Sequence, residues 1–114
     1  MTQHAGLTTE RWGQFPHFQR VLMIANEMNR ATRLMGHGDV ASRRLAYERV
    51  LRLVDLTVAV AERRSVRHEL LRWRDLVAAM FLEEAAQPDA HRAALRALLQ
   101  QTPTSAAQIS YLGC

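Results

Sequence analysis

The stretch from residue 39 to residue 61, DVASRRLAYERVLRLVDLTVAVA, constrains the fold of this chain more than any other part of the sequence. Its apolar positions recur three and four residues apart, which is the period of a helix; they are Leu45, Ala46, Val50, Leu53, Val54, Thr57, Val58 and Ala61. This apolar face is wider than one neighbouring helix could cover. At about 1.5 Å per residue the segment is roughly 33 Å long, enough to support two antiparallel neighbours. We therefore expect it to be the central helix of a bundle.

A second long helix is predicted before the central one. Phe15-Pro16 opens it, because proline is well tolerated at the first helical position. The apolar seam after it has three- and four-residue spacing and consists of Phe18, Val21, Leu22, Ala25, Met28, Thr32 and Met35. Gly36-His37-Gly38 ends this helix, and Asp39 is placed to cap the next one. The connection is so short that the two helices must be antiparallel neighbours.

Two further helices are predicted after the central one. Ser65 can cap a helix that runs to about Ala86, and its buried stripe consists of Val66, Leu70, Trp73, Val77, Met80 and Phe81. Gln87-Pro88-Asp89 then breaks the chain, with either Pro88 at the first helical position or Asp89 as the cap. The shorter helix after this break carries Ala94, Leu95, Leu98 and Leu99 before Thr102-Pro103 stops it. It must dock onto the other helices to be stable.

The fold predicted from these patterns is all-α, an antiparallel up-and-down bundle of three long helices plus a shorter fourth. Residues 15–101 form the bundle domain, since 114 residues of which 48% are hydrophobic favour a single domain. We expect residues 1–14 to be a flexible N-terminal arm with one turn around residues 9–14. Residues 102–114 are expected to be a C-terminal tail with room for a short helix.

The apolar runs of the sequence are far shorter than the ~20 residues that span a bilayer. The N-terminus also lacks the basic and then apolar pattern of a signal peptide. We therefore expect a cytoplasmic protein with no membrane partner. The single cysteine, Cys114, is the last residue, which excludes an intrachain disulfide and does not fit the C-terminal lipidation pattern.

The basic residues are all arginine, fifteen of them, and give a formal net charge of +4. Arginine favours bidentate contacts with carboxylate or phosphate, and a strongly basic chain raises the question of nucleic-acid binding. The densest cluster, which we take as the candidate binding site, consists of Arg63, Arg64, Arg67, Arg72 and Arg74. The alternative is a solvated face, because acidic residues are interleaved and Arg72 has the spacing of a surface ion pair with Asp75.

Within this cluster, Arg63 and His68 have the spacing Arg-x4-His, which resembles the active-site signature of the HEPN class of helical ribonucleases. That resemblance implies that His68 would move a proton and Arg63 would stabilise phosphate charge, usually across a dimer interface. Here the pair falls at a predicted junction between a loop and a helix. We keep Arg63 and His68 as the alternative catalytic pair.

Other catalytic and metal chemistry has no support in the sequence. The Glu-x-x-His motif of helical-bundle metal sites is missing, and the histidines His4, His17, His37, His68 and His91 are scattered. We expect them to be surface or turn residues. No Gly-x-Ser-x-Gly elbow and no glycine-rich phosphate loop occurs. The sequence therefore predicts no metal and no cofactor and favours a protein that is not an enzyme.

Several charged residues lie beside the apolar seams of the first two long helices. A pair such as Glu27 or Arg30 with Arg52 or Asp55 would fit across an antiparallel hairpin. Its expected role is to fix the register of the two helices, with a ligand pocket as the alternative.

The hairpin also carries a family resemblance. Glu27-x-x-Arg30-Ala31, Gly38-Asp39 and the pattern A-x-E-R-x-L-x-L-x-D-L-T over residues 46–57 resemble a small family of uncharacterised bacterial and archaeal helical proteins. Glu69-Leu70-Leu71-Arg72 and Phe81 extend this resemblance. It implies an up-and-down bundle and no known activity. The same hairpin is loosely similar to the four-helix flagellar export chaperones, which would imply a helical partner.

Our leading hypothesis is a non-enzymatic protein-interaction or scaffold bundle that self-associates as a dimer. Five residues fall beside or outside the main apolar stripes and leave apolar surface for a partner to cover; they are Leu34, Leu56, Val60, Leu71 and Leu76. One alternative is an RNA-binding or HEPN-like module that uses the Arg63/His68 end, although nucleic acid is not the favoured partner. A further alternative is an export-chaperone-like binder of a helical partner.

Overall fold

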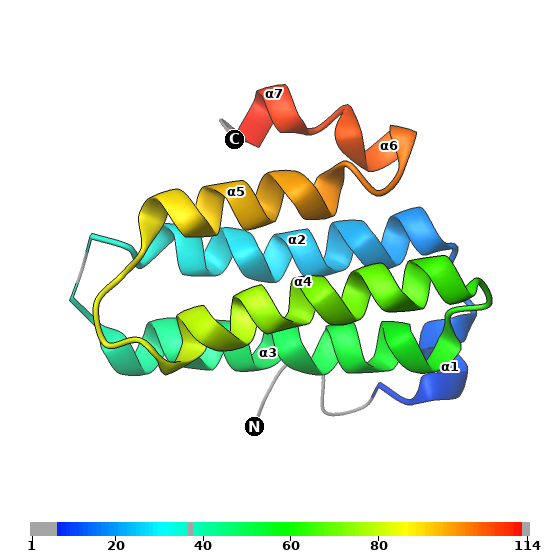
Figure 1. Ribbon diagram of the computed structural model, residues 1–114, viewed down its shortest axis with the longest axis horizontal. Helices are drawn as coiled ribbons and strands as arrows, with labels where there is room; N and C mark the ends of the chain where they lie inside the picture. Colours follow the sequence, from blue (N-terminus) through cyan, green and yellow to red (C-terminus); the bar gives the residue numbers. More distant parts are fainter. Residues whose placement is uncertain (1–6, 37, 113–114) are drawn as a thin grey trace.

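The structure is a computed structural model that describes residues 7–36 and 38–112, and within these ranges it contains helices and no strand. The helices are α1 (Thr9–Gly13), α2 (His17–Arg33), α3 (Val40–Val60), α4 (Arg64–Leu82), α5 (Pro88–Leu99), α6 (Pro103–Ala106) and α7 (Ile109–Leu112). The three long helices α2, α3 and α4 pack antiparallel, and α5 is the shorter fourth (Figure 1). The all-α bundle predicted from the sequence is confirmed.

The bundle has two ends, each named by the turn that it contains. At the α2–α3 end, on the left of Figure 1, α2 and α4 finish while α3 and α5 begin. At the α3–α4 end, on the right, α3 and α5 finish while α2 and α4 begin. Because helices alternate in direction, each end collects both N-termini and C-termini, and their free backbone groups need partners there.

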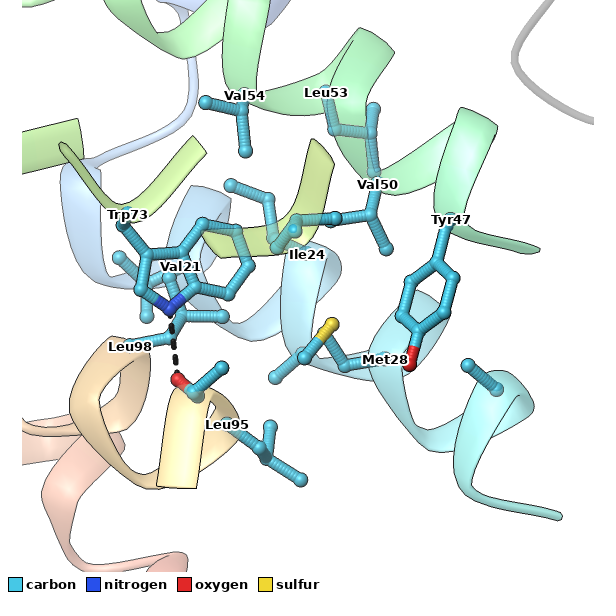
Figure 2. Close-up of a cluster of buried hydrophobic side chains, with 14 of the residues drawn as sticks. Val21, Ile24, Met28, Tyr47, Val50, Leu53, Val54, Trp73, Leu95 and Leu98 are labelled. Atoms are coloured by element: carbon cyan, nitrogen blue, oxygen red, sulfur yellow. Dashed lines mark hydrogen bonds between the residues drawn. The ribbon is translucent and has the colours of Figure 1, made fainter. Parts of the chain in front are cut away.

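The core lies between α2, α3, α4 and α5. The α3 residues Val50, Leu53 and Val54 have no exposed surface, as the apolar pattern of residues 39–61 predicts. Figure 2 shows them facing Val21 and Ile24 of α2. The predicted apolar face is wrong at one position, because the Leu45 side chain is 41% exposed.

Helix α5 docks through its predicted apolar stripe and through one buried hydrogen bond. Ala94, Leu95, Leu98 and Leu99 are all buried. The indole N–H of Trp73 on α4 donates to the carbonyl oxygen of Ala94, with 2.7 Å between Nε1 and O (dashed in Figure 2). The polar atom of a buried tryptophan usually needs such a partner, so this bond fixes how α5 sits against α4.

The turn between α2 and α3 has the predicted chemistry. Gly38 has a φ of +66°, a left-handed conformation that glycine adopts without steric cost. Asp39 caps α3, because its Oδ1 accepts from the backbone N–H of Ser42 at 3.0 Å. Pro88 takes the first position of α5, one of the two starts considered for that helix.

The end of α4 differs from the prediction, because the helix stops at Leu82 and not near Ala86. Two arginines of α3 supply donors to the carbonyl groups at this point. Arg43 Nη2 donates to the carbonyls of Glu83 and Glu84, and Arg44 donates to those of Phe81 and Leu82. The backbone leaves the helix at Glu83, whose φ of −78° and ψ of 137° are extended.

The N-terminal segment also differs from the expected arm. Helix α1 packs on α3, and its Trp12 has no exposed surface. Trp12 Nε1 donates to the Thr57 hydroxyl at 2.9 Å, and its ring meets Phe15 edge-on with centroids 5.9 Å apart. Burying a tryptophan contributes more than one turn of helix costs. Residues 7–14 are thus part of the bundle, while residues 1–6 lie outside the described residues.

The C-terminal segment, predicted to be a tail with room for a short helix, forms two short helices, α6 and α7. The Thr102 hydroxyl accepts from the backbone N–H of Ser105 and caps α6. The buried Ser105 hydroxyl donates to the Leu99 carbonyl at the end of α5, 2.6 Å away. Cys114 lies outside the described residues.

Candidate functional site

Two of the five arginines predicted as a binding cluster are engaged within the bundle. Arg67 Nη2 donates to the carbonyl oxygen of Ala61, the C-cap of α3, at 2.9 Å. Arg74 forms an ion pair with Asp55 of α3, with 2.7 Å between Nε and Oδ1. Both guanidiniums therefore tie α4 to α3 and are committed to backbone and carboxylate partners.

The other three arginines, Arg63, Arg64 and Arg72, are exposed. A helix advances by about 100° per residue, so Arg72 points about 160° away from Arg74 around α4. Arg64 is at the first position of α4 and Arg63 at its N-cap. The five residues therefore do not form one patch, and only Arg63 lines the pocket at the α3–α4 end of the bundle.

The alternative catalytic pair is also separated. His68 is exposed and lies five residues after Arg63, which corresponds to about 140° around the helix axis. Arg63 itself precedes the first helical residue, with φ −91° and ψ 129°. Within one chain, the two side chains do not converge on a common point.

The charged pair expected to fix the hairpin register is formed differently. Asp55 pairs with Arg74 of α4, so that ion pair links α3 to α4 and not to α2. Glu27 is buried, and its Oε2 lies 3.7 Å from Nε of Arg30, one turn away on the same helix.

A pocket of about 410 Å³ opens at the α3–α4 end, and we call it the polar pocket. It is lined by His17, Arg20, Val60, Ala61, Glu62, Arg63, Val66 and Gln101. Four separate segments meet here: the start of α2, the turn from α3 to α4, the first turn of α4 and the chain just after α5. Of the predicted cluster it contains Arg63, beside the basic residue Arg20, which the sequence did not single out.

The electrostatics of the polar pocket are dominated by partly buried cationic and neutral groups. Burial lowers the pKa of Arg20, and the neighbouring Glu62 carboxylate opposes that shift. Burial also lowers the pKa of His17, the positive charge of Arg20 lowers it further, and a hydrogen bond with Gln101 opposes both effects. His17 is therefore neutral at pH 7, and its Nε2 is buried without a partner among the described residues.

A buried polar network lies toward the opposite end of the bundle, centred on His91. The imidazole is 2% exposed, so it is neither a surface nor a turn residue as expected. Its Nδ1 lies 2.8 Å from the Tyr47 hydroxyl, and its Nε2 lies 2.8 Å from the Thr32 hydroxyl and 3.1 Å from the Met28 carbonyl. A carbonyl only accepts, so we assign the proton to Nε2 and the donor role toward Nδ1 to Tyr47.

This network is structural. Burial lowers the pKa of His91 to about 4, and burial raises the pKa of Tyr47 to about 12, so both groups are neutral at pH 7. Both side chains are buried, with His91 2% and Tyr47 1% exposed, so no substrate can reach them. Their bonds join α2, α3 and α5 at one point.

An apolar groove of about 510 Å³ runs between α4 and α5, and we call it the α4–α5 groove. It is lined by Asp75, Leu76, Ala79, Met80, Gln87, Ala90, Ala93 and Ala94. The alanines leave room beside two larger side chains, Leu76 and Met80. Leu76 is 53% exposed, so this groove presents apolar surface to solvent.

The apolar residues predicted to lie outside the main stripes fall into two groups, one buried or partly buried and one exposed. Leu56 and Val60 pack against the core, and Leu34 is partly buried. Leu71 and Leu76 are exposed by 42% and 53%, and both belong to α4. Apolar surface is therefore concentrated on α4, where Leu82 is also 72% exposed.

The described part of the chain shows no group of three or more histidine, cysteine or acidic residues arranged to hold a metal ion. None of its helices combines the length and apolar character needed to cross a bilayer. No protein-family model, no curated protein and no solved structure matches this chain. The resemblances noted in the sequence therefore stay predictions.

Sequence reasoning missed several residues that shape these sites. His17 and Arg20 have the three-residue spacing that puts two side chains on one face of a helix start, and this signal was available. Gln101 gave no signal, because its approach to His17 depends on how α5 docks. Tyr47 and His91 are separated by 44 residues, so no local pattern pairs them.

Proposed function

We propose that this chain is a non-enzymatic interaction module that self-associates as a dimer through the outer face of α4. The observation that carries the proposal is the concentration of exposed leucine on this helix, at Leu71, Leu76 and Leu82. Solvated faces of small bundles rarely place several large apolar side chains on one helix. We place this module in the cytoplasm on the grounds of its sequence.

The outer face of α4 is complementary to itself in an antiparallel arrangement. A two-fold axis midway along the helix sets Arg72 opposite the partner's Asp75 and Asp75 opposite the partner's Arg72. Leu71 and Leu76 flank this charged pair on the two edges of the face, about 140° apart around α4. All four side chains are exposed in the single chain. A second copy would thus pair opposite charges and cover the leucines at the edges of the face.

The α4–α5 groove supports the same occupant. Leu76 lines the groove, so a second copy that covers Leu76 also reaches the groove. The alanines of α4 and α5 leave about 510 Å³ there for a side chain of that copy. Closer packing against small residues would increase the apolar area removed from water, at about 25 cal/mol per Å².

Light scattering after size-exclusion chromatography tests the dimer. We expect the wild-type chain to elute as a dimer at moderate salt and the double variant Leu71→Glu with Leu76→Glu to elute as a monomer. Leu45→Glu is the matched control, because Leu45 is an exposed leucine on α3, outside the proposed surface. A wild-type monomer, or a Leu45→Glu variant that dissociates equally, contradicts the proposal.

A charge exchange tests the register separately. Asp75→Arg alone should weaken the dimer, because it places Arg72 against another arginine. Adding Arg72→Asp should restore the dimer, since the charges are then paired again with opposite signs. If the double variant is weaker than the single one, this register is wrong.

A mobility-shift assay over a salt series addresses the nucleic-acid alternative. The interaction module should give no shift with RNA. A salt-sensitive shift that is lost in Arg63→Ala and Arg67→Ala would instead favour RNA binding by that end of the bundle.

A further inference from the structure

The polar pocket lies apart from the proposed dimer surface and is not explained by it. Its lining residues come from the α3–α4 end, whereas the proposed two-fold axis lies midway along α4. Its volume of about 410 Å³ is in the range of pockets that bind small molecules. A single chain contains all of its lining residues.

Both arginines of the pocket keep donors for a ligand. Arg20 uses Nε to donate to the Phe15 carbonyl at 2.8 Å, which fixes the guanidinium and leaves its terminal nitrogens available. The Arg63 side chain has no hydrogen bond or ion pair within residues 7–36 and 38–112. Two guanidiniums at one pocket form the donor arrangement that binds the oxygens of a phosphate or carboxylate group.

The other polar residues that line the pocket are His17, Glu62 and Gln101. His17 Nε2 is buried without a protein partner within the described residues, so a ligand oxygen can satisfy it. Glu62 is the opposing charge, and its carboxylate acts on Arg20 through space. Because no ion pair joins Glu62 to either arginine in the described part of the chain, this carboxylate moderates the positive field without occupying the donors.

The backbone adds to the positive field. α4 starts at the pocket without a side-chain cap, and Val66 of its first turn lines the cavity. α2 also starts there without a side-chain cap, at His17. The free N–H groups of two helix starts therefore lie at the same end as the two guanidiniums.

We propose that the polar pocket binds a small molecule that carries a phosphate group, with Arg20 and Arg63 as its principal contacts. The doubly charged phosphate suits two guanidiniums better than a single carboxylate does. Val60, Ala61 and Val66 form the apolar part of the lining. A phosphate ester whose organic part contacts these side chains should therefore bind more tightly than inorganic phosphate.

Isothermal titration calorimetry at constant ionic strength tests this site, with phenyl phosphate and inorganic phosphate as probes. We expect saturable binding of one phenyl phosphate per chain. Arg63→Gln should weaken it at least about tenfold, the effect of losing one charge-assisted hydrogen bond. Glu62→Gln should tighten it, because the opposing carboxylate is removed. Tighter binding of phenyl phosphate than of inorganic phosphate identifies an ester as the ligand, and equal affinity identifies free phosphate.

The control variant is Arg33→Gln, which removes an exposed arginine of α2 outside the pocket and outside the proposed dimer surface and should leave the affinity unchanged. Arg20→Gln also loses the bond to Phe15, so Arg63→Gln, which breaks no bond, is the decisive variant. No saturable binding to the wild-type chain, or equal weakening by Arg33→Gln and Arg63→Gln, overturns the proposal. The Leu71→Glu, Leu76→Glu variant should still bind, so failure of the dimer and failure of the pocket are separate results.

Discussion

The two ends of the bundle use the same residue types in opposite ways. Toward the α2–α3 end, Arg43 and Arg44 donate to four carbonyl groups, and both ring nitrogens of His91 have partners. At the α3–α4 end, the Arg63 guanidinium is without a partner in the described residues, and His17 keeps an unpaired Nε2. The arginines and the histidine named at the first end use their donors in internal bonds, and the second end retains donors beside a pocket.

This contrast shows that the abundance of arginine does not by itself indicate a binding surface. A guanidinium has five N–H donors in a planar arrangement, so one side chain can satisfy several carbonyls where a helix ends. Arg67 does the same for Ala61 at the end of α3. Part of the arginine content is therefore needed by the fold, and the part left over at the α3–α4 end is available to a ligand.

The largest expected effect on stability is a loss at low pH, caused by protonation of His91 toward the α2–α3 end. The folded chain keeps His91 neutral down to its pKa of about 4, whereas the unfolded chain binds a proton near 6.5. Stability is therefore full above pH 6.5 and falls as the pH drops from 6.5 toward 4. This difference in pKa corresponds to about 3 kcal/mol of unfolding free energy. Urea denaturation at several pH values measures it.

Variants at two histidines check that prediction. His91→Gln should lower stability at neutral pH but flatten the loss between about pH 7 and pH 4. His68→Gln should keep the wild-type slope, because His68 is exposed. A His91→Gln variant with the wild-type slope would mean that the acid sensitivity has another source.

A smaller effect is expected from Arg43→Met. This change keeps the buried apolar stem and removes the donors to Glu83 and Glu84, at a cost of about 2 kcal/mol. The midpoint and slope of urea denaturation give the value, measured at one protein concentration because self-association would shift it. Arg33→Met, at an exposed position of α2 outside the proposed dimer surface, should change stability by less than about 0.5 kcal/mol. Equal losses in both variants would show that the carbonyl contacts do not stabilise the end of α4.

The smallest effect on stability is expected at the α3–α4 end. Arg63→Gln should change the unfolding free energy by less than about 0.5 kcal/mol, since its side chain makes no internal bond in the described part of the chain. The same denaturation experiment measures it. A loss as large as that of Arg43→Met would show that Arg63 is a structural residue, and the contrast between the ends would disappear.

The sequence predicted the elements whose causes are local. Asp39 and Pro88 mark helix starts through chemistry that acts within one turn, and the spacing of Val50 and Val54 fixes the buried face of α3. The end of α4 was not predictable in this way. It depends on Arg43, which lies 41 residues before the Glu84 carbonyl that it contacts.

The candidate site was less accessible to sequence analysis. The arginine cluster was found, but the helix turns its members to different sides, and only Arg63 reaches the polar pocket. Its neighbours there come from α2 and from the chain just after α5, so they are joined only when the bundle has packed. Trp12 was missed because a helix of five residues is too short to show a period.

The bonds that hold α5 have a consequence for how the chain matures during synthesis. Trp73 and Tyr47 both belong to the long helices, yet their polar atoms find partners on Ala94 and His91, which emerge from the ribosome later. A nascent chain that ends before residue 88 has an indole N–H and a phenol O–H without these partners, on the side of the three long helices that α5 later covers. The hairpins made first are thus incomplete, and the last quarter of the polypeptide closes them.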